Sequence, residues 1–391
     1  MPPTFELLRT CGAARRGRLS TAHGIVDTPA FMPVGTLGAV KGVSPQELAA
    51  AGASVLLANL YHLALRPGIE GIVRLGGLHR FTGWPGPLAT DSGGFQVWSL
   101  AQLRAVGEEG VTFRSHLDGS SCRFTPAEVV AWQQDLGVDL AMVLDECTPW
   151  PVGREAAELS WERTARWARR ARAAWRPGES SLFGIVQGSV YRELRERAAA
   201  ELAALDFDGY AIGGVSVGEP PAERRAVVEW TAPALPAARP RYLMGVGYPA
   251  DILHAASCGI DLFDCVLPTR NARHGVLFTR RGVLKIRHAA YRADPRPVDA
   301  ECACPCCARL SRAFLHHLAR AGEITAQVLA TLHNLRFYLD FMGGLRQAIE
   351  LGTLTDLAAK FAIRSPGEDL PEDHEPGSDP VSPDPLEQRS S

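Results

Sequence analysis

The sequence lacks several features that mark large classes of proteins. No apolar run approaches the roughly 18–20 residues of a membrane-spanning helix. The first residues, MPPTFELLRT, lack the charged-then-apolar pattern of a secretory leader, so we expect a cytoplasmic protein. No GxGxxG motif follows an early strand candidate, and no ATP-binding loop is present. Neither a dinucleotide nor ATP is therefore an expected cofactor.

Lysine is also scarce, because 38 of the 41 basic residues are arginine. Residues 265–293 contain seven Arg or Lys and no acidic residue. A basic face of this kind suits a phosphate-rich partner. A solvated surface in an arginine-rich protein explains the charge equally well, so charge alone does not separate the two interpretations.

The net charge of −2 hides an asymmetry between the body and the end of the chain. Residues 365–391 hold eight acidic residues and one arginine, a charge of −7, which leaves +5 on residues 1–364. The same segment holds six prolines and almost no large apolar residue. We expect it to be a disordered, acidic, Pro-rich tail.

The nine cysteines do not indicate a disulfide framework. Their number is odd, and four of them lie within residues 302–307, which is more typical of a metal site in a reduced compartment. Three thiols in a C-x-C-x-x-C pattern and a histidine in a later helical run supply a closed tetrahedral shell for a structural zinc ion: Cys302, Cys304, Cys307 and His333. The fourth ligand stays open, since His316 and His317 are nearer in sequence. Cys306, the spare thiol, is expected to face away.

Short apolar stretches alternate with helical patterns along the body of the chain. SPQELAAAG and TPAEVVAWQQDLG both start with a capping residue and stop at a glycine, and PADILHAASCG is similar. Alternation of this kind predicts an α/β fold, a (β/α)8 TIM-like barrel, with an open doubly wound sheet as the alternative. The eight strand candidates are residues 30–34, 54–59, 87–90, 140–144, 182–186, 209–213, 242–245 and 260–263.

Three further segments complete the predicted organisation. Residues 5–28 are expected to form an N-terminal β-flap, and residues 111–126 a β-hairpin inserted after the third strand. The barrel with these additions covers residues 1–284, an inserted C-terminal zinc-binding subdomain with closing helices covers 285–364, and the tail covers 365–391.

Polar residues end several of the strand candidates. Asp91, Asp145, Gln187 and Asp264 each follow an apolar stretch directly. One such residue usually marks a turn, but the carboxyl ends of barrel strands converge on one mouth, where the chemistry of this fold lies. Two carboxylates at one mouth suggest glycosidic chemistry, in which one attacks the anomeric carbon and the other moves a proton.

Beyond Asp264, a proline is expected to introduce a loop that holds Arg270, Asn271 and Arg273.

Seven motifs together resemble those of the tRNA-guanine transglycosylases, in the same order along the chain. The match covers roughly residues 5–360, and its motifs are DSGGFQVWSL (91–100), DECTPW (145–150), IVQGS (185–189), GGVSVGE (213–219), YLMGVG (242–247), FDCVLPTR (263–270) and the C-x-C-x-x-C group with His333. The resemblance implies an enzyme that exchanges guanine at the anticodon wobble position of tRNAs with GUN anticodons (those for Asp, Asn, His and Tyr) for another purine-like base.

The same resemblance assigns roles to individual residues. Asp264 is implied as the nucleophile on ribose C1′, through a covalent intermediate, and Asp91 as the general acid/base. The implied base site comprises Ser92, Gly93, Gly94, Phe95, Asp145, Cys147, Gln187, Gly214 and Met244. The implied RNA contacts are Gly245, Val246, Gly247, Tyr248, Asp251, Thr269, Arg270, Asn271, Ala272 and Arg273. One structural Zn²⁺ per subunit and a homodimer are expected.

Val217 and Cys147 resemble bacterial members of that family, which insert 7-aminomethyl-7-deazaguanine (preQ1). The loop after Arg270 departs from the family pattern at Asn271, Ala272 and His274. Two other classes stay as alternatives. A hydrolytic zinc barrel needs an open metal site, and a non-catalytic tRNA-binding subunit would lack the nucleophile.

Overall fold

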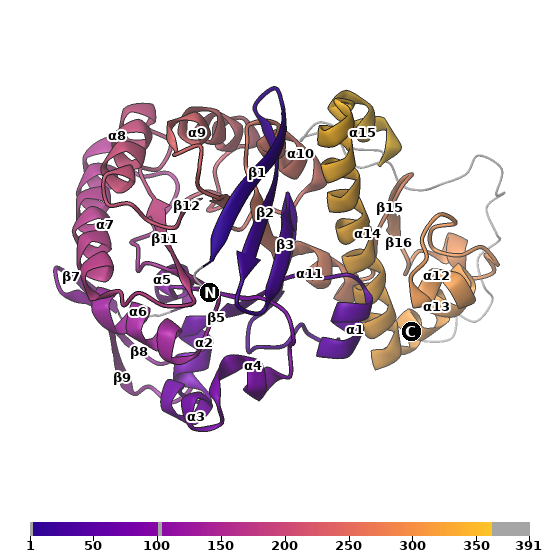
Figure 1. Cartoon of the computed structure of the whole chain (residues 1–391). Helices are drawn as coiled ribbons and strands as arrows, with labels where there is room; N and C mark the ends of the chain where they lie inside the picture. Colours follow the sequence, from indigo (N-terminus) through magenta and orange to yellow (C-terminus); the bar gives the residue numbers. More distant parts are fainter. Residues whose placement is uncertain (1–2, 101–103, 362–391) are drawn as a thin grey trace.

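The eight apolar stretches form the strands of one closed parallel barrel (Figure 1). The computed structural model describes residues 3–100 and 104–361. Neighbours in the barrel follow chain order, and β14 closes the ring by pairing with β4. Nearly all strand side chains are buried, because helices cover the outer face, so the barrel prediction is confirmed and the open sheet is wrong. The strands are β4 (Ala30–Gly35), β5 (Leu56–Asn59), β6 (Leu88–Asp91), β10 (Leu140–Met142), β11 (Ser181–Val186), β12 (Gly209–Ile212), β13 (Arg241–Leu243) and β14 (Leu262–Cys265).

Helices connect these strands, and local capping explains where several of them begin. The Ser44 side chain accepts from the backbone N–H of Glu47 in a full capping box, and the Thr125 side chain accepts from that of Glu128. Both starts were predicted. The helices of this part are α1 (Pro45–Ala50), α2 (Leu60–Leu65), α3 (Ile69–Arg74), α4 (Gly77–Thr82), α5 (Gly94–Leu100), α6 (Pro126–Asp135), α7 (Arg154–Ala174), α8 (Arg192–Ala203), α9 (Pro221–Ala234), α10 (Pro249–Ser257) and α11 (Leu267–Arg273).

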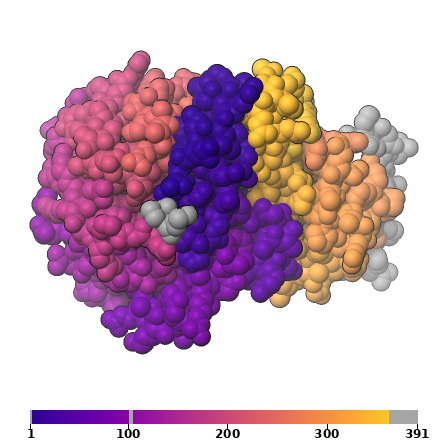
Figure 2. Space-filling model, viewed as in Figure 1, coloured from indigo at the N-terminus to yellow at the C-terminus, as the bar shows by residue number. Residues whose placement is uncertain are grey.

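The predicted N-terminal flap is a three-stranded antiparallel sheet that crosses the amino-terminal end of the barrel. It consists of β1 (Thr4–Cys11), β2 (Ala14–Thr21) and β3 (Gly24–Thr28). Figure 2 shows these residues in indigo across the middle of one face, beside the later helices in yellow. The Arg15 Nε lies 3.3 Å from Asp261 Oδ1, and both side chains are buried. This ion pair holds the sheet against the start of β14. The opposite end of the barrel is not covered by this sheet.

A second small sheet lies between α5 and α6. It consists of β7 (Arg104–Gly107), β8 (Gly110–Arg114) and β9 (Ser121–Phe124). The predicted hairpin over 111–126 corresponds to β8 and β9, and β7 is an additional strand. The turn between β7 and β8 packs against α7, where the guanidinium groups of Arg166 and Arg170 bind the Glu108 carboxylate.

The C-terminal part builds a second, smaller core and then returns to the barrel. Its elements are β15 (Val276–Thr279), β16 (Gly282–Lys285), the 3₁₀ helix η1 (Ala289–Tyr291), α12 (Pro305–Arg309), α13 (Arg312–Ala321), α14 (Ile324–Leu351) and α15 (Leu354–Lys360). The boundary placed between residues 284 and 285 lies inside β16, and the smaller core also includes Ala272 and Leu277. The predicted tail, 365–391, lies outside the described residues.

Helix α14 joins the two cores and holds α11 in place. Its first turns contribute Ala326 and Ala330 to the smaller core, and its later turns pack into the barrel core and beside β1 and β2 (Figure 1). Asn334 is fully buried and makes three hydrogen bonds: Nδ2 donates to Pro268 O (2.9 Å) and Val276 O (3.0 Å), and Oδ1 accepts from Phe278 N (3.0 Å). The described residues contain no helix that is both long and apolar enough to cross a bilayer.

The segment after Asp264 differs from the prediction. A loop was expected to hold Arg270, Asn271 and Arg273, but these residues lie in α11. Pro268 stands in the first turn, where a proline is compatible with a helix because its missing N–H has no partner there in any case. The apolar face of α11 packs on α14, so this helix is rigidly placed.

Candidate active site

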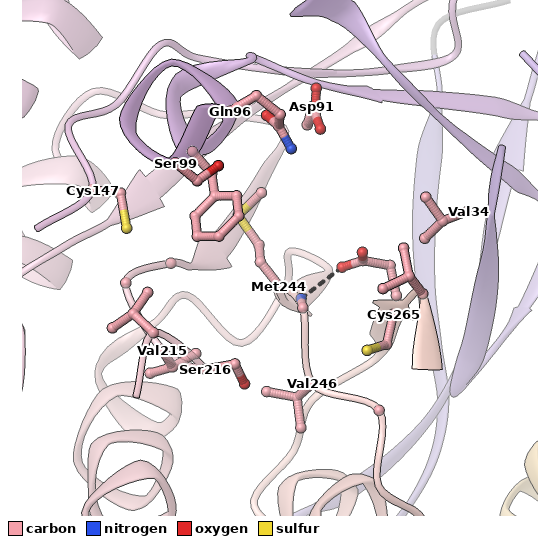
Figure 3. A pocket seen from close by; sticks show the side chains of 18 of the residues that line it. Val34, Asp91, Gln96, Ser99, Cys147, Val215, Ser216, Met244, Val246 and Cys265 are labelled. Carbon is pink, nitrogen blue, oxygen red and sulfur yellow. Dashed lines mark hydrogen bonds between the residues drawn. The ribbon is translucent and has the colours of Figure 1, made fainter. Parts of the chain in front are cut away.

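A cavity of about 670 Å³ opens at the carboxyl ends of the barrel strands. Seven of the eight barrel strands contribute a residue to its lining or directly precede one that lies there, so side chains from distant parts of the chain meet there. Figure 3 shows labelled members of this wall, including Asp91, Cys147, Val215 and Met244, around one hollow. The cavity brings together both predicted catalytic residues and every predicted base-site residue: Asp91, Ser92, Gly93, Gly94, Phe95, Asp145, Cys147, Gln187, Gly214, Met244 and Asp264.

Asp264 lies near the end of β14 and is held by two hydrogen bonds to one of its oxygens. The Tyr242 hydroxyl donates to Oδ1 at 2.6 Å and the Gly245 N–H donates to the same atom at 2.8 Å (dashed line in Figure 3). Oδ2 has no hydrogen-bond partner among the described residues. Burial raises the pKa of Asp264, although both donors favour the charged form. The carboxylate is therefore oriented, with one oxygen left for a reacting group.

Asp91 ends β6 and faces the same cavity. Its Oδ1 accepts from Leu60 N (3.1 Å), and its Oδ2 accepts from the Asn59 side-chain amide. Burial and, to a lesser extent, the negative charge of Asp264 raise the pKa of Asp91, the hydrogen bonds oppose both effects, and the resulting pKa is about 7. A carboxyl group with this pKa exchanges a proton readily near neutral pH.

Asp145, after β10, forms a polar corner with two neighbours. Ser92 Oγ donates to Asp145 Oδ1 (3.2 Å), and Gln187 Nε2 donates to Oδ2 (2.6 Å). Burial raises the pKa of Asp145 despite these donors. Gly94 is required beside it, because a Cβ there would lie 2.5 Å from the Asp145 carbonyl oxygen. The corner offers a carboxylate with two fixed oxygens to a ligand that has two adjacent N–H groups.

Apolar and aromatic groups complete the cavity. Phe95 on α5 is 44 % exposed and lines the cavity, so its ring is accessible to a ligand that stacks on it. Met244 and Cys147 line the same space, and burial raises the pKa of the Cys147 thiol, so this cysteine is a neutral wall rather than a nucleophile.

Four residues that line or support the cavity were missed by sequence reasoning. Asn59 ends a predicted strand and could have been found by the rule that identified Asp91. Glu219 belongs to a quoted motif; its buried carboxylate accepts from Ser216 N (2.6 Å) and Val217 N (2.9 Å). Tyr242 is the first residue of the YLMGVG motif but was given no role, because it lies within a strand pattern that core packing explains. Arg195 gave no signal, because its helical pattern is typical of a surface helix.

The predicted RNA contacts divide into two groups. Gly245, Val246, Gly247, Tyr248, Asp251 and Arg270 line the cavity, and Tyr248 and Arg270 are exposed. Thr269, Asn271, Ala272 and Arg273 do not line it. The side chains of Thr269 and Ala272 are buried, and the Arg273 Nη1 donates to the carbonyl of Thr269 (2.9 Å).

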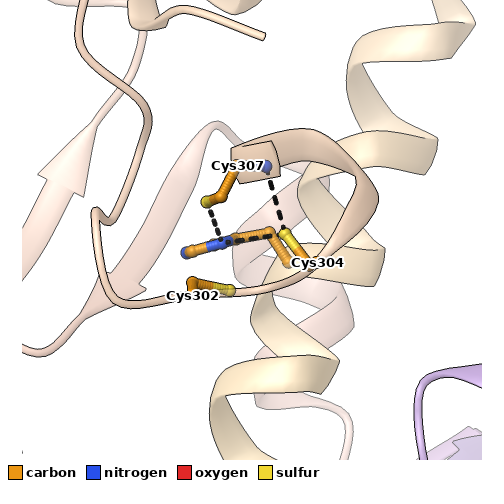
Figure 4. A group of neighbouring side chains, drawn as sticks. Cys302, Cys304 and Cys307 are labelled. Carbon is orange, nitrogen blue, oxygen red and sulfur yellow. Dashed lines mark hydrogen bonds between the residues drawn. The ribbon is translucent and has the colours of Figure 1, made fainter. Parts of the chain in front are cut away.

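The three cysteines and the histidine predicted as metal ligands do come together (Figure 4). The donor atoms of Cys302, Cys304, Cys307 and His333 all lie within 4.8 Å of one another. His333 Nδ1 lies 3.6 Å from the Cys304 sulfur and 3.3 Å from the Cys307 sulfur, whereas Nε2 lies 2.8 Å from Phe278 O. A proton on Nε2 donated to that carbonyl leaves Nδ1 as an acceptor facing the thiols, as metal ligation requires. We call these four residues the thiol–imidazole group.

The other candidate ligands point elsewhere. Cys306 is buried in the smaller core outside the thiol–imidazole group, as predicted. His316 Nδ1 lies 2.8 Å from Ile286 O, and His317 is exposed. The group is therefore a closed set of three thiols and one imidazole without a place for water, which does not suit a hydrolytic metal centre.

A second group of possible ligands lies at the other end of the barrel. His23 Nδ1 and His79 Nε2 lie 3.0 and 3.2 Å from the two oxygens of Asp139. The two rings are stacked with centroids 3.5 Å apart. Parallel rings cannot both direct an in-plane lone pair at one ion, so we interpret this group as a hydrogen-bonded junction between the flap and the barrel.

Comparisons with known proteins show the family of this chain. The family model described as Queuine tRNA-ribosyltransferase matches residues 10–366. A protein of that name from Nitrosospira multiformis is 54% identical over 363 residues, covering 92% of this chain and 99% of the relative. One from Nitrosomonas europaea is 55% identical over 358 residues (92% and 96%), and one from Desulforudis audaxviator is 54% identical over 360 residues (91% and 97%).

The thiol–imidazole group yields a direct prediction. We expect the purified chain to hold one metal ion, and Cys304→Ser to lose it, because a hydroxyl is a much weaker ligand than a thiolate. Cys306→Ser is the matched control and should keep the ion. Elemental analysis after gel filtration measures both. Equal metal loss from the two variants, or full retention in Cys304→Ser, contradicts the ligand set.

Proposed function

Because the chain belongs to the queuine tRNA-ribosyltransferase family, we propose that it is a tRNA-guanine transglycosylase that replaces the wobble guanine of GUN-anticodon tRNAs with preQ1. The observation that carries this proposal is the pair of carboxylates at one mouth of the barrel, the buried Asp264 and the partly exposed Asp91. One is oriented with a free oxygen, and the other has a pKa of about 7. Their environments differ, which is the arrangement that separates a nucleophile from an acid/base.

In the first half of the reaction, Asp264 Oδ2 attacks ribose C1′ of the wobble guanosine and the C1′–N9 bond breaks. The departing guanine takes its proton at N9 from Asp91, which becomes a carboxylate. Tyr242 and Gly245 hold Asp264 Oδ1 during the attack. The product of this half is a covalent ester between the RNA sugar and Asp264, with neutral guanine in the cavity.

In the second half, the incoming base replaces guanine and Asp91 works as a base. Its carboxylate takes the N9 proton of the new base, whose nitrogen attacks C1′ and releases the Asp264 carboxylate. Each proton and each bond of the first half is thereby reversed, so neither ATP nor a redox cofactor is needed. A retaining outcome at C1′ follows from two displacements.

Base selection follows from the polar corner at Asp145. Guanine and preQ1 both carry a ring N–H next to an exocyclic amino group, a donor pair that matches the two oxygens of one carboxylate. Adenine lacks this pair, so the lone pairs of the buried Asp145 carboxylate that face the ligand would stay unsatisfied, at a cost of about 1–3 kcal/mol. Ser92 and Gln187 would still bind the carboxylate. Phe95 supports stacking of the heterocycle, and Val217 narrows the cavity in favour of the small aminomethyl group of preQ1.

The thiol–imidazole group supports a structural zinc ion, since this donor set favours zinc over harder cations. Zinc there would cross-link residues 302–307 to α14 and so stabilise the smaller core beside α11. Another metal at one equivalent would contradict this identity. We further propose a cytoplasmic homodimer; a monomer in sedimentation velocity at micromolar concentration would contradict the dimer.

The central test is an RNA adduct on denaturing gels. Wild type incubated with a GUN-anticodon tRNA should give an adduct that guanine or preQ1 discharges, whereas Asp264→Asn should give none and lose exchange by at least about 10³-fold, because an amide is a poor nucleophile. Asp206→Asn, at the amino-terminal end of the barrel, is the matched control.

Three outcomes would overturn parts of this proposal. A wild-type level of adduct in Asp264→Asn moves the nucleophile elsewhere. Discharge by queuine but not by preQ1 corrects the incoming base. Equal adduct with a tRNA whose wobble guanine is changed to adenine removes the anticodon assignment.

The arginines of α11 give a further prediction. Arg270 is exposed at the rim of the cavity, whereas the Arg273 guanidinium is half-buried and donates within its own helix. We therefore expect Arg270→Ala to weaken tRNA binding and flatten its salt dependence by about one unit of slope, through one lost phosphate contact. Arg239→Ala, near the flap, is the control. If Arg270→Ala leaves the salt dependence of tRNA affinity unchanged but strongly lowers turnover at saturating tRNA, Arg270 takes part in the chemical step instead.

A further inference from the structure

A fully buried arginine lies directly behind the base site. Arg195 on α8 has no exposed surface, and it does not line the cavity. Its guanidinium donates to four backbone carbonyls at the ends of β11 and β12: Nε to Ser189 O (2.7 Å), Nη1 to Val186 O (3.0 Å) and Gly213 O (2.7 Å), and Nη2 to Gly214 O (3.2 Å). No carboxylate pairs with it among the described residues.

Such a group is costly, so its arrangement is informative. Taking a guanidinium out of water is unfavourable, and burial lowers the pKa of Arg195 to about 10, which still leaves it charged at neutral pH. The partial negative charges of four carbonyls offset the cost. An apolar side chain could fill the same space, but the carbonyls of Ser189, Gly213 and Gly214 would then lose this donor, and Val186 O would keep only the Gly213 N–H at 3.0 Å.

The consequence for the cavity follows from peptide geometry. The peptide between Gly213 and Gly214 is trans, so its C=O and N–H point in opposite directions. With the Gly213 carbonyl turned back to Arg195, the Gly214 N–H is directed to the cavity side, and it has no hydrogen-bond partner within the described part of the chain. Gly214 has φ +64°, and a Cβ there would lie 2.2 Å from Gln187 Oε1, so a side chain at this position would be strained and would displace Gln187.

The Arg195 guanidinium also supports the polar corner at Asp145, through the backbone next to Gln187. Val186, whose carbonyl it binds, directly precedes Gln187, and Gln187 Nε2 donates to Asp145 at 2.6 Å. One side chain thus fixes both the carboxylate corner and the amide that faces it. A heterocycle bound between them would present its ring N–H and amino group to Asp145 and its ring carbonyl oxygen to the Gly214 N–H.

We propose that Arg195 is a positioning residue for base recognition, which holds the Gly214 N–H as the donor for the ring carbonyl of a 6-oxopurine or its 7-deaza analogue. The inference rests on the proposed function. Two contacts would then select the base. Asp145 would accept from its ring N–H and amino group, and the Gly214 N–H, oriented by Arg195, would donate to its ring carbonyl oxygen.

The test compares two ligands that differ at the acceptor only. In 6-thioguanine the ring N–H and the amino group are kept, and the carbonyl oxygen becomes sulfur, a weaker acceptor. Calorimetric Kd values should favour guanine by about tenfold in wild type, the effect of one hydrogen bond to a fixed donor. In Arg195→Met this ratio should fall to within about twofold, while the Kd for tRNA changes little. Arg195→Lys, which keeps the charge but cannot reach four carbonyls, should give an intermediate ratio.

Arg192→Met is the matched control, because Arg192 is an exposed residue of the same helix that pairs with Glu196. Arg195→Lys keeps the test decisive if the methionine variant does not fold. An unchanged ratio in folded Arg195→Met or Arg195→Lys overturns the proposal, and so does a parallel loss of guanine and tRNA binding. Since the readout is equilibrium binding, it stands apart from the exchange assay: wild type that binds guanine but exchanges no base would contradict the proposed function alone.

Discussion

The rest of this site depends on two carboxylates that both lie at the mouth of the barrel. Neither Asp91 nor Asp264 can be desolvated without a rise in its pKa, and the charge of Asp264 raises that of Asp91 further. The hydrogen-bond donors around the two carboxylates are arranged differently. Tyr242 and Gly245 orient Asp264 through one oxygen, whereas Asn59 and Leu60 hold Asp91 through both of its oxygens. The pair can therefore hold one negative charge and one exchangeable proton near neutral pH.

Three sets of interactions hold the scaffold around these two carboxylates in place. The N-terminal sheet closes the far end of the barrel through the buried Arg15–Asp261 pair. The smaller core, with its thiol–imidazole group, anchors α14. Asn334 of α14 donates a hydrogen bond to Pro268 O and so holds α11, which bears Arg270 at the rim of the cavity. Arg195 fixes the backbone behind the base site. None of these supporting side chains lines the cavity itself.

Most of the architecture was predictable because barrel strands are buried on both faces and stand out as short apolar runs. The acids that end β6 and β14 were predictable for the same reason, since a charge after such a run must lie at a strand end. Sequence could not locate Arg195 or Tyr242, because a buried arginine on an amphipathic helix and a tyrosine inside a strand resemble ordinary surface and core residues. The error at α11 has a similar origin: a proline is equally compatible with a loop and with a first helical turn, and only packing on α14 decides.

The protonation of Asp91 tests the central claim most directly. Carboxyl ¹³C NMR of aspartate-labelled protein, with Asp91→Asn to assign the resonance, measures its pKa without any substrate. One aspartate should titrate near pH 7, and its pKa should fall in Asp264→Asn, because the neighbouring negative charge is removed. If every aspartate titrates below about pH 5, or if the Asp91 resonance is unaffected by Asp264→Asn, the two carboxylates are not a coupled pair and the division between nucleophile and acid/base is contradicted.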